Sequence, residues 1–363
     1  MSRRILFVVK SLFSGGDAYQ LRLLTGQVLT QGWDVHVALM RLESGEHHGF
    51  EPQVTIHDLS QHTDRVSNNT VRLRRTIQRL NPEIIHSWDL ESALTCHLAA
   101  AGMRLERIST LLEIPPKKDL WFRMASKRFT RGTRLTVCHP MIADYLDEHN
   151  FIDRIDQTTI VPNAAPPAFP GLSNAREELL VRMEIENPES LVITAIADFT
   201  PRTRIKDLIW AASLLNCVQY DVHLLVFGSG PQRPKLKTYM DRTQSHRYVH
   251  LLNHSPLVEL ALAGSQVYWH SHLTRPTPTE LMMAQSNKVP SVSVLGPGTD
   301  ELVLHQQTAF ATNYGARDEF ARWTKYVLEQ AEPTRQLVTQ AHRHLQATFP
   351  LNAMIEPYLD LYQ

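Results

Sequence analysis

The sequence has few cysteines, no long apolar run and no excess of charge of either sign. Its three cysteines, Cys96, Cys138 and Cys217, are too few and too widely spaced for a disulfide framework or a metal-ligand motif. We therefore expect a reducing, cytoplasmic environment. Lys and Arg together number 37, as do Asp and Glu. This equality argues against a broadly basic surface for nucleic acid, so no nucleic-acid partner is expected.

The chain also lacks an apolar stretch of the roughly 20 residues that a membrane-spanning helix needs. Peripheral contact is therefore the only membrane association we expect. The run Ile5–Val9 is too short for the apolar core of a signal peptide and predicts a buried first strand instead. The 18 histidines are interpreted mainly as solvated surface groups, which gain positive charge as the pH falls through about 6.5.

What the sequence does contain is a regular alternation of short apolar runs and amphipathic stretches, typical of parallel sheets covered by helices. In the first half, strands are predicted at Ile5–Val9, Asp34–Met40, Glu83–His86, Arg107–Leu112 and Arg134–Cys138, and helices at Tyr19–Gln31, Val71–Leu80, Glu91–Ala101 and Met141–His149. In the second half, strands are predicted at Leu191–Ala197, Asp221–Phe227, Tyr248–Leu252, Gln266–Trp269 and Pro290–Val294, and helices at Asp207–Leu215, Pro234–Asp241, Pro256–Ala263, Thr279–Gln285, Arg317–Gln330, Pro333–Ala347 and from Asn352.

A proline-rich segment, Val161–Pro170, separates the two halves. Proline continues neither a helix nor a central strand, so we predict a first domain over residues 1–170 and a second over 171–348, with a terminal helix over 349–363 that packs back on the first. The 363 residues suit two α/β domains of this size. Two such domains favour a small-molecule site between them, outside the carboxyl ends of the strands.

Two glycine pairs follow predicted strands. Gly15-Gly16 precedes the first helix, where glycine lets backbone N–H groups approach an anion at the helix N-terminus. A plain tight turn is the alternative. Gly228 and Gly230 follow the strand Asp221–Phe227 without the third glycine and the acidic residue of a dinucleotide fingerprint. Whether they form a ligand loop or a turn stays open.

Several motifs occur in an order that matches one family. They are Ser14-Gly15-Gly16, Gln31–Val35, Ile84–Trp88, Val161-Pro162-Asn163, Gly228–Pro231, Pro290, Gly298–Val303 and the closing stretch Phe349–Tyr362. Together they resemble glycosyltransferase family 4, the retaining enzymes of the GT-B class. The resemblance implies an α/β fold of two Rossmann-like doubly wound domains with a cleft between them, and a C-terminal helix that crosses back to the first domain.

The same resemblance implies a nucleotide-sugar co-substrate (a UDP-, GDP- or ADP-sugar), bound by the second domain, and an unidentified acceptor on the first. It implies no other cofactor, and the absence of an Asp-x-Asp pair is consistent with no metal. Donor contacts are expected from Arg202, Lys206, Gly228, Gly230, Glu280, Gly298 and Thr299, and phosphate or acceptor contacts from Gly15 and Gly16. The candidate catalytic residues are Arg204, Arg275 and His86.

The sequence departs from the family at the residues that handle the donor. Arg275 and Met283 stand where the family has two glutamates, and neither is a good hydrogen-bond acceptor. Glu280 lies one helical turn before Met283 and restores one carboxylate on the same helix face. Asp198 and Thr203 replace a phosphate-binding arginine and lysine, although Arg202, Arg204 and Lys206 keep cations nearby.

These departures leave three hypotheses. The first is a divergent retaining glycosyltransferase in which Arg204, Arg275 and their neighbours stabilise the departing diphosphate. The second is an inactive GT-B protein that acts as a binding or scaffolding module. The third is a GT-B epimerase or a related nucleotide-sugar enzyme, which needs a pair of carboxylates for acid–base chemistry. The sequence alone places no such pair.

Overall fold

The computed structural model describes residues 3–12, 15–41, 49–60, 66–114, 127, 132–152, 158–169, 174–253, 257–273 and 275–363. The chain divides into two compact units. Unit 1 comprises Met1–Leu12, Asp17–Ala164 and Leu351–Gln363, and unit 2 comprises Phe13–Gly16 and Ala165–Pro350. Each unit is built on one parallel sheet with its own hydrophobic core.

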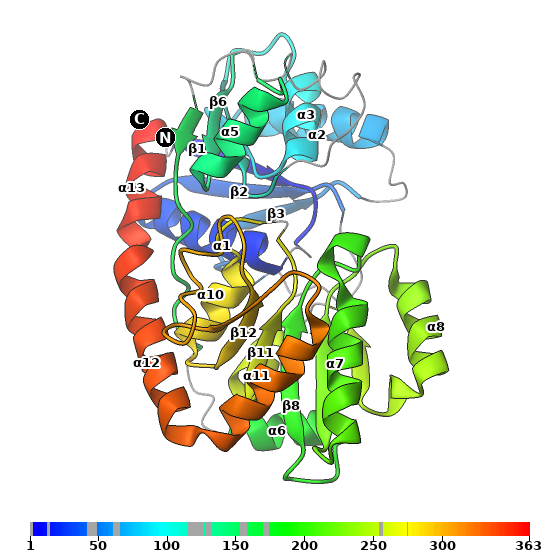
Figure 1. The fold of residues 1–363 in the computed structure, drawn as a ribbon. Helices are drawn as coiled ribbons and strands as arrows, with labels where there is room; N and C mark the ends of the chain where they lie inside the picture. The colour runs from blue at the N-terminus through cyan, green and yellow to red at the C-terminus, as the bar shows by residue number, and fades with distance from the viewer. Residues whose placement is uncertain are drawn as a thin grey trace. The chain divides into compact units, whose positions relative to one another are not determined.

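Unit 1 has a parallel sheet of seven strands in its described part, in the order β3-β2-β1-β4-β5-β6-β7. Figure 1 labels β1, β2, β3 and β6 of this sheet. Its strands are β1 (Arg4–Val9), β2 (Asp34–Leu39), β3 (Thr55–Asp58), β4 (Ile84–Ser87), β5 (Glu106–Leu111), β6 (Arg134–Val137) and β7 (Thr158–Ile160). Its helices are α1 (Gly15–Thr30), α2 (Val66–Leu80), α3 (Leu90–Ala99), α5 (Pro140–Glu148) and α13 (Leu351–Leu361). The strand order reverses between β1 and β4, as in Rossmann folds.

The central strand β1 shows why this sheet is covered on both faces. Ile5, Phe7 and Val9 belong to a core cluster that includes apolar residues of α1, α5 and α13. Leu6 and Val8, which point to the other face, belong to a cluster that includes residues of α2 and α3. Because both sets of alternate residues are buried, the strand is continuously apolar instead of alternating.

The two ends of the chain lie side by side in unit 1, where Figure 1 marks both termini. The Arg3 guanidinium donates a 2.7 Å hydrogen bond to the carbonyl oxygen of Tyr362 and stacks over the Trp33 ring at 4.2 Å. Met354, Ile355 and Tyr358 of α13 are buried in the same core as β1. The terminal helix is therefore an integral part of unit 1, as predicted for a helix that returns to the first domain.

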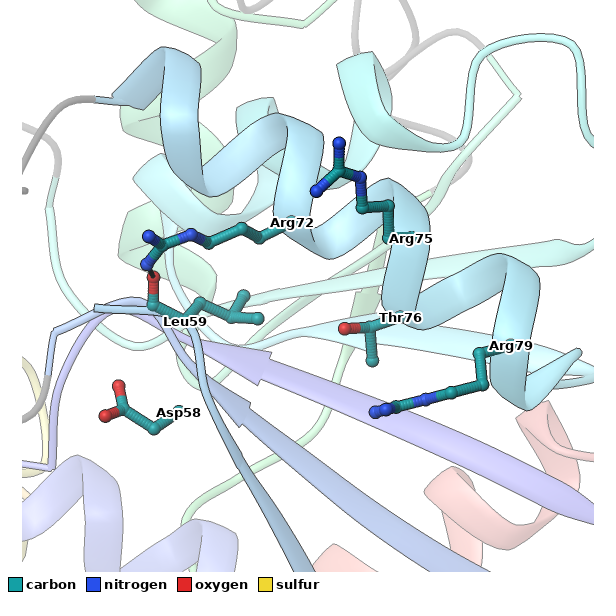
Figure 2. Close-up of a pocket in the computed structure, with 6 residues that line it drawn as sticks. All are labelled: Asp58, Leu59, Arg72, Arg75, Thr76 and Arg79. Carbon is teal, nitrogen blue, oxygen red and sulfur yellow. Dashed lines mark hydrogen bonds between the residues drawn. The ribbon is translucent and has the colours of Figure 1, made fainter. Parts of the chain in front are cut away.

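The edge strand β3 and the helix α2 border a groove at the rim of unit 1 (Figure 2). The groove has a volume of about 310 Å³ and is lined by Asp58, Leu59, Arg72, Arg75, Thr76 and Arg79. Neither β3 nor the residues that line this groove were singled out by the sequence motifs.

Unit 2 has six parallel strands in its described part, in the order β10-β9-β8-β11-β12-β13. Its strands are β8 (Leu191–Ile196), β9 (Val222–Phe227), β10 (Val249–Leu252), β11 (Val267–His270), β12 (Ser291–Val294) and β13 (Phe310–Thr312). Its helices are α6 (Ala175–Arg182), α7 (Ile205–Cys217), α8 (Arg233–Thr243), α9 (Leu257–Gly264), α10 (Thr279–Ser286), α11 (Arg317–Glu329) and α12 (Ala331–Thr348). This order also reverses once, between β8 and β11.

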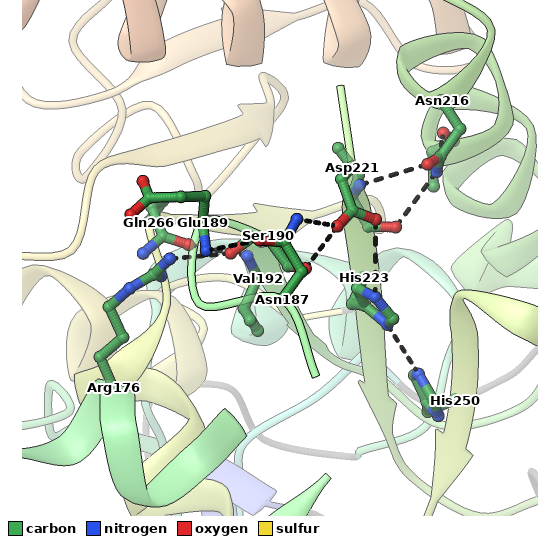
Figure 3. Close-up of polar contacts among 12 residues, drawn as sticks. Arg176, Asn187, Glu189, Ser190, Val192, Asn216, Asp221, His223, His250 and Gln266 are labelled. Atoms are coloured by element: carbon green, nitrogen blue, oxygen red, sulfur yellow. Dashed lines mark hydrogen bonds and ion pairs between the residues drawn. The ribbon is translucent and has the colours of Figure 1, made fainter. Parts of the chain in front are cut away.

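The amino ends of the unit 2 strands are held by a polar network (Figure 3). The Asp221 carboxylate accepts hydrogen bonds from the Asn187 amide at 2.7 Å and from the Ser190 hydroxyl at 2.5 Å. Beside it, the stacked rings of His223 and His250 come within 3.3 Å through Nδ1 and Nε2. The polar groups at the amino ends of these strands are thus engaged in contacts within the protein.

The α/β alternation predicted from the sequence is confirmed, and each predicted strand and helix has a counterpart within a few residues of its expected bounds. The sequence patterns missed the short strands β3, β7 and β13 and the helix α6. Residues 297–302, which include most of the Gly298–Val303 motif, form turns. The predicted boundaries after residues 170 and 348 stay predictions beside the observed division into units.

Candidate functional site

The strand order of unit 2 defines where a ligand is expected to bind. Strands β8 and β11 are neighbours, and the chain leaves them toward opposite sides of the sheet. Open α/β sheets bind ligands outside the carboxyl ends of the strands at such a reversal. Here β8 is followed by Asp198, and β11 ends in His270 and leads to Ser271 and His272.

A buried ion pair lies beside these strand ends. One Arg275 nitrogen donates to the Glu280 carboxylate at 3.1 Å, and another lies 3.7 Å from the Asp198 carboxylate. The Arg275 and Glu280 side chains are only 8% and 4% exposed. A buried charge is tolerated only with a close partner. The structure thus brings together two carboxylates, Asp198 and Glu280, a pair that the sequence alone did not place. Both form ion pairs with the guanidinium of Arg275.

The Glu280 carboxylate also accepts a hydrogen bond from the backbone of Gly16. The backbone N–H of Gly16 donates to Oε1 of Glu280 at 3.2 Å, and both residues belong to unit 2. A Cβ on Gly16 would lie 2.5 Å from Cβ of Thr279, so only glycine fits here. The Gly16 N–H is thus occupied by a carboxylate of unit 2 itself.

Several buried polar atoms around this ion pair have no hydrogen-bond partner among the described residues. They are both ring nitrogens of His270, the Tyr268 hydroxyl and Oε2 of Glu280. Burial lowers the pKa of His270 to about 4, although the Glu280 charge opposes the shift, and burial raises the pKa of Tyr268 well above 10. Buried polar atoms are nearly always paired in native proteins. Four of them in one place indicate a site for water or a polar ligand.

Gly228 and Gly230 serve close packing beside this cluster. A Cβ on Gly228 would lie 2.0 Å from the Ala197 carbonyl oxygen, and one on Gly230 would lie 2.7 Å from the Phe199 carbonyl oxygen. The Phe199 N–H also donates to the Ser229 carbonyl at 2.7 Å. The two glycines therefore let this loop press against the segment that carries Asp198.

Gly298 and Thr299 lie in the turns that follow β12. Gly298 adopts φ +86°, and its carbonyl accepts a 2.9 Å hydrogen bond from the N–H of Thr277. The Thr299 side chain is fully buried and bonds within its own turn, to the carbonyl of Val294 at 3.2 Å and the N–H of Gly296 at 3.0 Å. Gly298 therefore contacts the segment before α10, whereas Thr299 stabilises the turn that follows β12.

The three cations of the segment 202–206 lie after β8 but are not equivalent. Arg204, at φ +50°, precedes α7, is ion-paired with Asp207 and lies 5.1 Å from the Tyr314 ring centre. Lys206 is exposed and lies 5.4 Å from the Tyr239 ring. Arg202 is exposed as well. Arg202 and Lys206 are thus more accessible to an anion than Arg204.

His86 lies in unit 1 and is completely buried. Its Nδ1 is 2.6 Å from the Tyr362 hydroxyl and its Nε2 is 2.7 Å from Oγ1 of Thr110. Burial lowers the pKa of His86 to about 3. Both ring nitrogens of His86 are therefore within hydrogen-bond distance of protein groups, so neither is free for the catalytic role that was expected. The contact with Tyr362 indicates that His86 holds the C-terminal end of the chain in place.

Four of the histidines that the structure describes are exceptions to the interpretation of the histidines as mainly surface groups. His36, His86, His270 and His272 are at least 93% buried. Sequence reasoning therefore missed His270 and His272, whose rings lie 4.2 Å apart, and the neighbouring Tyr268. Their position at the end of a strongly apolar strand was the available signal.

Within the described ranges, no helix is long and apolar enough to cross a membrane. Those same residues include no group of three or more His, Cys, Asp or Glu side chains arranged to hold a metal ion.

The fold and the site together define a protein of two Rossmann-like units with a buried polar cluster at the strand-order reversal of the second. Residues 14–169 match the family described as Glycosyltransferase Family 4, and residues 179–344 match the family described as Glycosyl transferases group 1. The two matches together span most of the chain. The protein therefore belongs to the family 4-like glycosyltransferases of the GT-B class.

Solved structures with the same fold are distant in sequence. HepE of Anabaena, in complex with UDP-glucose, is 16% identical over 99% of both chains, with a TM-score of 0.78. Sucrose-phosphate synthase of Thermosynechococcus elongatus is 14% identical over 99% of this chain and 98% of its own, with a TM-score of 0.78. WaaG, a glycosyltransferase involved in lipopolysaccharide biosynthesis, is 14% identical over 98% and 99%, with a TM-score of 0.72. No curated protein matches the chain significantly.

Proposed function

We propose that the protein transfers a sugar, with retention of configuration, from a nucleoside diphosphate sugar to an acceptor hydroxyl. Family membership supports the reaction class, and the UDP-glucose complex of a protein with the same fold supports the donor class. The observation that carries the proposal for this chain is the buried Arg275 at the strand-order reversal of unit 2, surrounded by polar atoms without partners.

In this reaction the bond between the sugar C1 and the diphosphate oxygen breaks, and a bond from C1 to the acceptor oxygen forms. The hydroxyl proton of the acceptor passes to the departing diphosphate. Negative charge develops on that diphosphate, so fixed cations accelerate the step. Arg275 is the candidate for this role because its guanidinium is held in place by Glu280 and Asp198. Arg202 and Lys206 are exposed cations that follow the neighbouring strand.

The first test is a thermal-shift screen of the whole protein against UDP, GDP, ADP and their sugars, without added metal. A ligand that binds only the folded state raises the melting temperature with its concentration. We expect a concentration-dependent rise with one of the three nucleotide series. A flat response to all of them at millimolar concentration contradicts the proposal.

A second candidate function is a binding module that no longer transfers sugar. One observation favours it: the Glu280 carboxylate holds both the N–H of Gly16 and the guanidinium of Arg275. These are the two groups best suited to an anion, and a carboxylate that remains on them competes with a phosphate. In the transferase, Glu280 instead moves aside or accepts hydrogen bonds from the donor sugar.

Glu280→Gln distinguishes these two functions because it removes the charge and keeps the shape. If the carboxylate excludes phosphate, the variant binds UDP at least tenfold more tightly than the wild type. If it serves the donor sugar, the variant loses at least tenfold in UDP-glucose affinity while UDP affinity changes less. Calorimetric titration measures both, and Glu259→Gln, an exposed residue of α9, is the matched control. No change with either ligand, or an equal loss with both, contradicts both roles.

A further inference from the structure

The helix α2 is unusual in its charge. Its sequence, Val66–Leu80, contains Arg72, Arg74, Arg75 and Arg79 and no acidic residue. Surface helices of globular proteins ordinarily mix both signs, and like charges at i, i+3 and i, i+4 destabilise an isolated helix. Four uncompensated arginines on one short helix therefore suggest a function other than folding.

Two of these arginines have evident structural contacts. One Arg74 nitrogen donates to the carbonyls of Ala99 and Ala101, both at 3.0 Å. Arg72 donates to the Leu59 carbonyl at 2.7 Å, which leaves its remaining N–H groups on the side of the groove (Figure 2). The contacts of Arg74 explain its presence as a structural residue. Arg72 is fixed by one contact and still lines the groove.

Arg75 and Arg79 are exposed, and neither forms a hydrogen bond or an ion pair with any residue that the structure describes. Both line the groove of about 310 Å³ between α2 and β3, together with Arg72 and Thr76. Figure 2 shows Arg72 and Arg79 extending from α2 toward the side of β3. The charge of Arg79 also affects the pKa of His57. Burial is the largest cause of the lowering of that pKa to about 4, followed by the charge of His36 and then by that of Arg79.

The groove carries one acidic residue, Asp58, at the end of β3. Its Oδ1 is already bonded to the N–H of Ser60 at 2.7 Å and to its hydroxyl at 2.6 Å. Three arginines against this one carboxylate leave the groove with an excess of two positive charges. Guanidinium groups bind phosphate oxygens in a bidentate manner, and the helix rise places Arg72 and Arg79 about 10 Å apart along α2.

We propose that this groove is a binding site for a small molecule that carries phosphate or diphosphate, contacted by Arg72, Arg75 and Arg79. Its volume lies at the lower end of the range for small-molecule pockets, about 300–1,000 Å³. The concave shape favours a compact ligand over a flat membrane surface. None of its residues belongs to the site of unit 2, so the inference does not depend on sugar transfer.

The test is a calorimetric titration of the whole protein with pyrophosphate, using three variants beside the wild type. The double variant Arg75→Gln/Arg79→Gln removes the two arginines without partners. The double variant Arg182→Gln/Arg335→Gln removes two exposed arginines elsewhere and changes the net charge equally. Arg275→Lys reports on the proposed site of unit 2. We expect the groove variant to lose one binding event, with at least a tenfold weaker affinity, while the charge-matched control Arg182→Gln/Arg335→Gln and Arg275→Lys keep that event.

Two results overturn the inference. If the groove variant binds pyrophosphate as the wild type does and only Arg275→Lys weakens it, the anion site is that of unit 2, and the proposed function survives. In the second result, pyrophosphate does not bind but vesicles of phosphatidylglycerol do, and vesicles of phosphatidylcholine do not. If the groove variant also loses the binding of phosphatidylglycerol vesicles, the arginines bind an anionic lipid surface. Retained phosphate binding in Arg275→Lys, lost in the groove variant, supports the inference.

Discussion

At the scale of single residues, the molecule is distinguished by charged and polar side chains buried where a ligand is expected. Arg275 and Glu280 form an ion pair that is at least 92% buried on both sides, and His270 lies beside them with both ring nitrogens unbonded among the described residues. Such groups cost stability unless they are paired. Their occurrence in one place is the main support for the ligand site proposed in unit 2.

The Arg275–Glu280 pair makes a clear prediction for stability. Replacing one partner leaves the other charge buried, which typically costs about 3–5 kcal/mol. We expect Arg275→Met and Glu280→Met each to lower the unfolding free energy by about this amount, and the double variant to cost less than the sum of the two. Urea denaturation of the four proteins measures this coupling. Additive effects would show that the pair does not interact.

At the scale of elements, the positions of most strands and helices could be predicted from local sequence, but the contacts made by the loops between them could not. Continuous apolar runs predicted β1, β8, β9 and β11 because strands buried on both faces need no alternation. The edge strands β3 and β13 were missed because short edge strands carry too few apolar residues to stand out. The pairing of Gly16 with Glu280 joins segments 264 positions apart, so no local pattern reveals it.

The same limit applies to the glycines. Sequence reasoning identified Gly228 and Gly230 as special but left open whether they bind a ligand or form a turn. The structure shows backbone packing as the immediate reason. The family pattern supplied the residues expected to bind the donor, Glu280 among them, and these stay predictions. The grouping of Tyr268 and His270 with Glu280 depends on tertiary packing that the sequence does not display.

The packing of Gly228 is testable with a matched glycine. Gly228→Ala places a Cβ 2.0 Å from the Ala197 carbonyl oxygen, so we expect a loss of more than about 2 kcal/mol, as for strained backbone sites. Gly26→Ala, in the middle of α1 with open space around it, should raise stability by about 0.5–1 kcal/mol. Thermal denaturation of both compares them. A tolerated Gly228→Ala would mean that the loop moves freely.

At the scale of the whole molecule, buried neutral histidines couple stability to pH. Burial lowers the pKa of His86 to about 3 and of His270 to about 4, below the unfolded value of about 6.5. The unfolded chain therefore binds more protons as the pH falls below about 6.5, and the folded state is progressively lost toward pH 4. Each group contributes a slope of up to about 1.4 kcal/mol per pH unit.

We expect urea denaturation between pH 7 and pH 5 to show falling stability, and His86→Gln to reduce the slope. The exposed His246 provides the control, since His246→Gln should leave the slope unchanged. Stability that is flat or rises as the pH falls in this range would contradict the assignment of these histidines as buried and neutral.

The two units also divide the proposed functions of the molecule. Unit 2 carries the buried cluster proposed for the nucleotide sugar, and unit 1 carries the arginine groove proposed for a phosphate-bearing ligand. Each proposal rests on side chains of one unit alone, so the variants in one leave the other site chemically intact.

The measurement that tests the central claim most directly is a calorimetric titration with UDP of the wild type, of Arg275→Lys and of the control Arg182→Lys. Lysine keeps the charge but not the planar two-pronged donor geometry of arginine. We expect the wild type and the control to bind UDP, and Arg275→Lys to bind it at least tenfold more weakly. A wild type that binds neither UDP nor another nucleoside diphosphate, or an Arg275→Lys variant that binds as the wild type does, would contradict the placement of the donor site in unit 2.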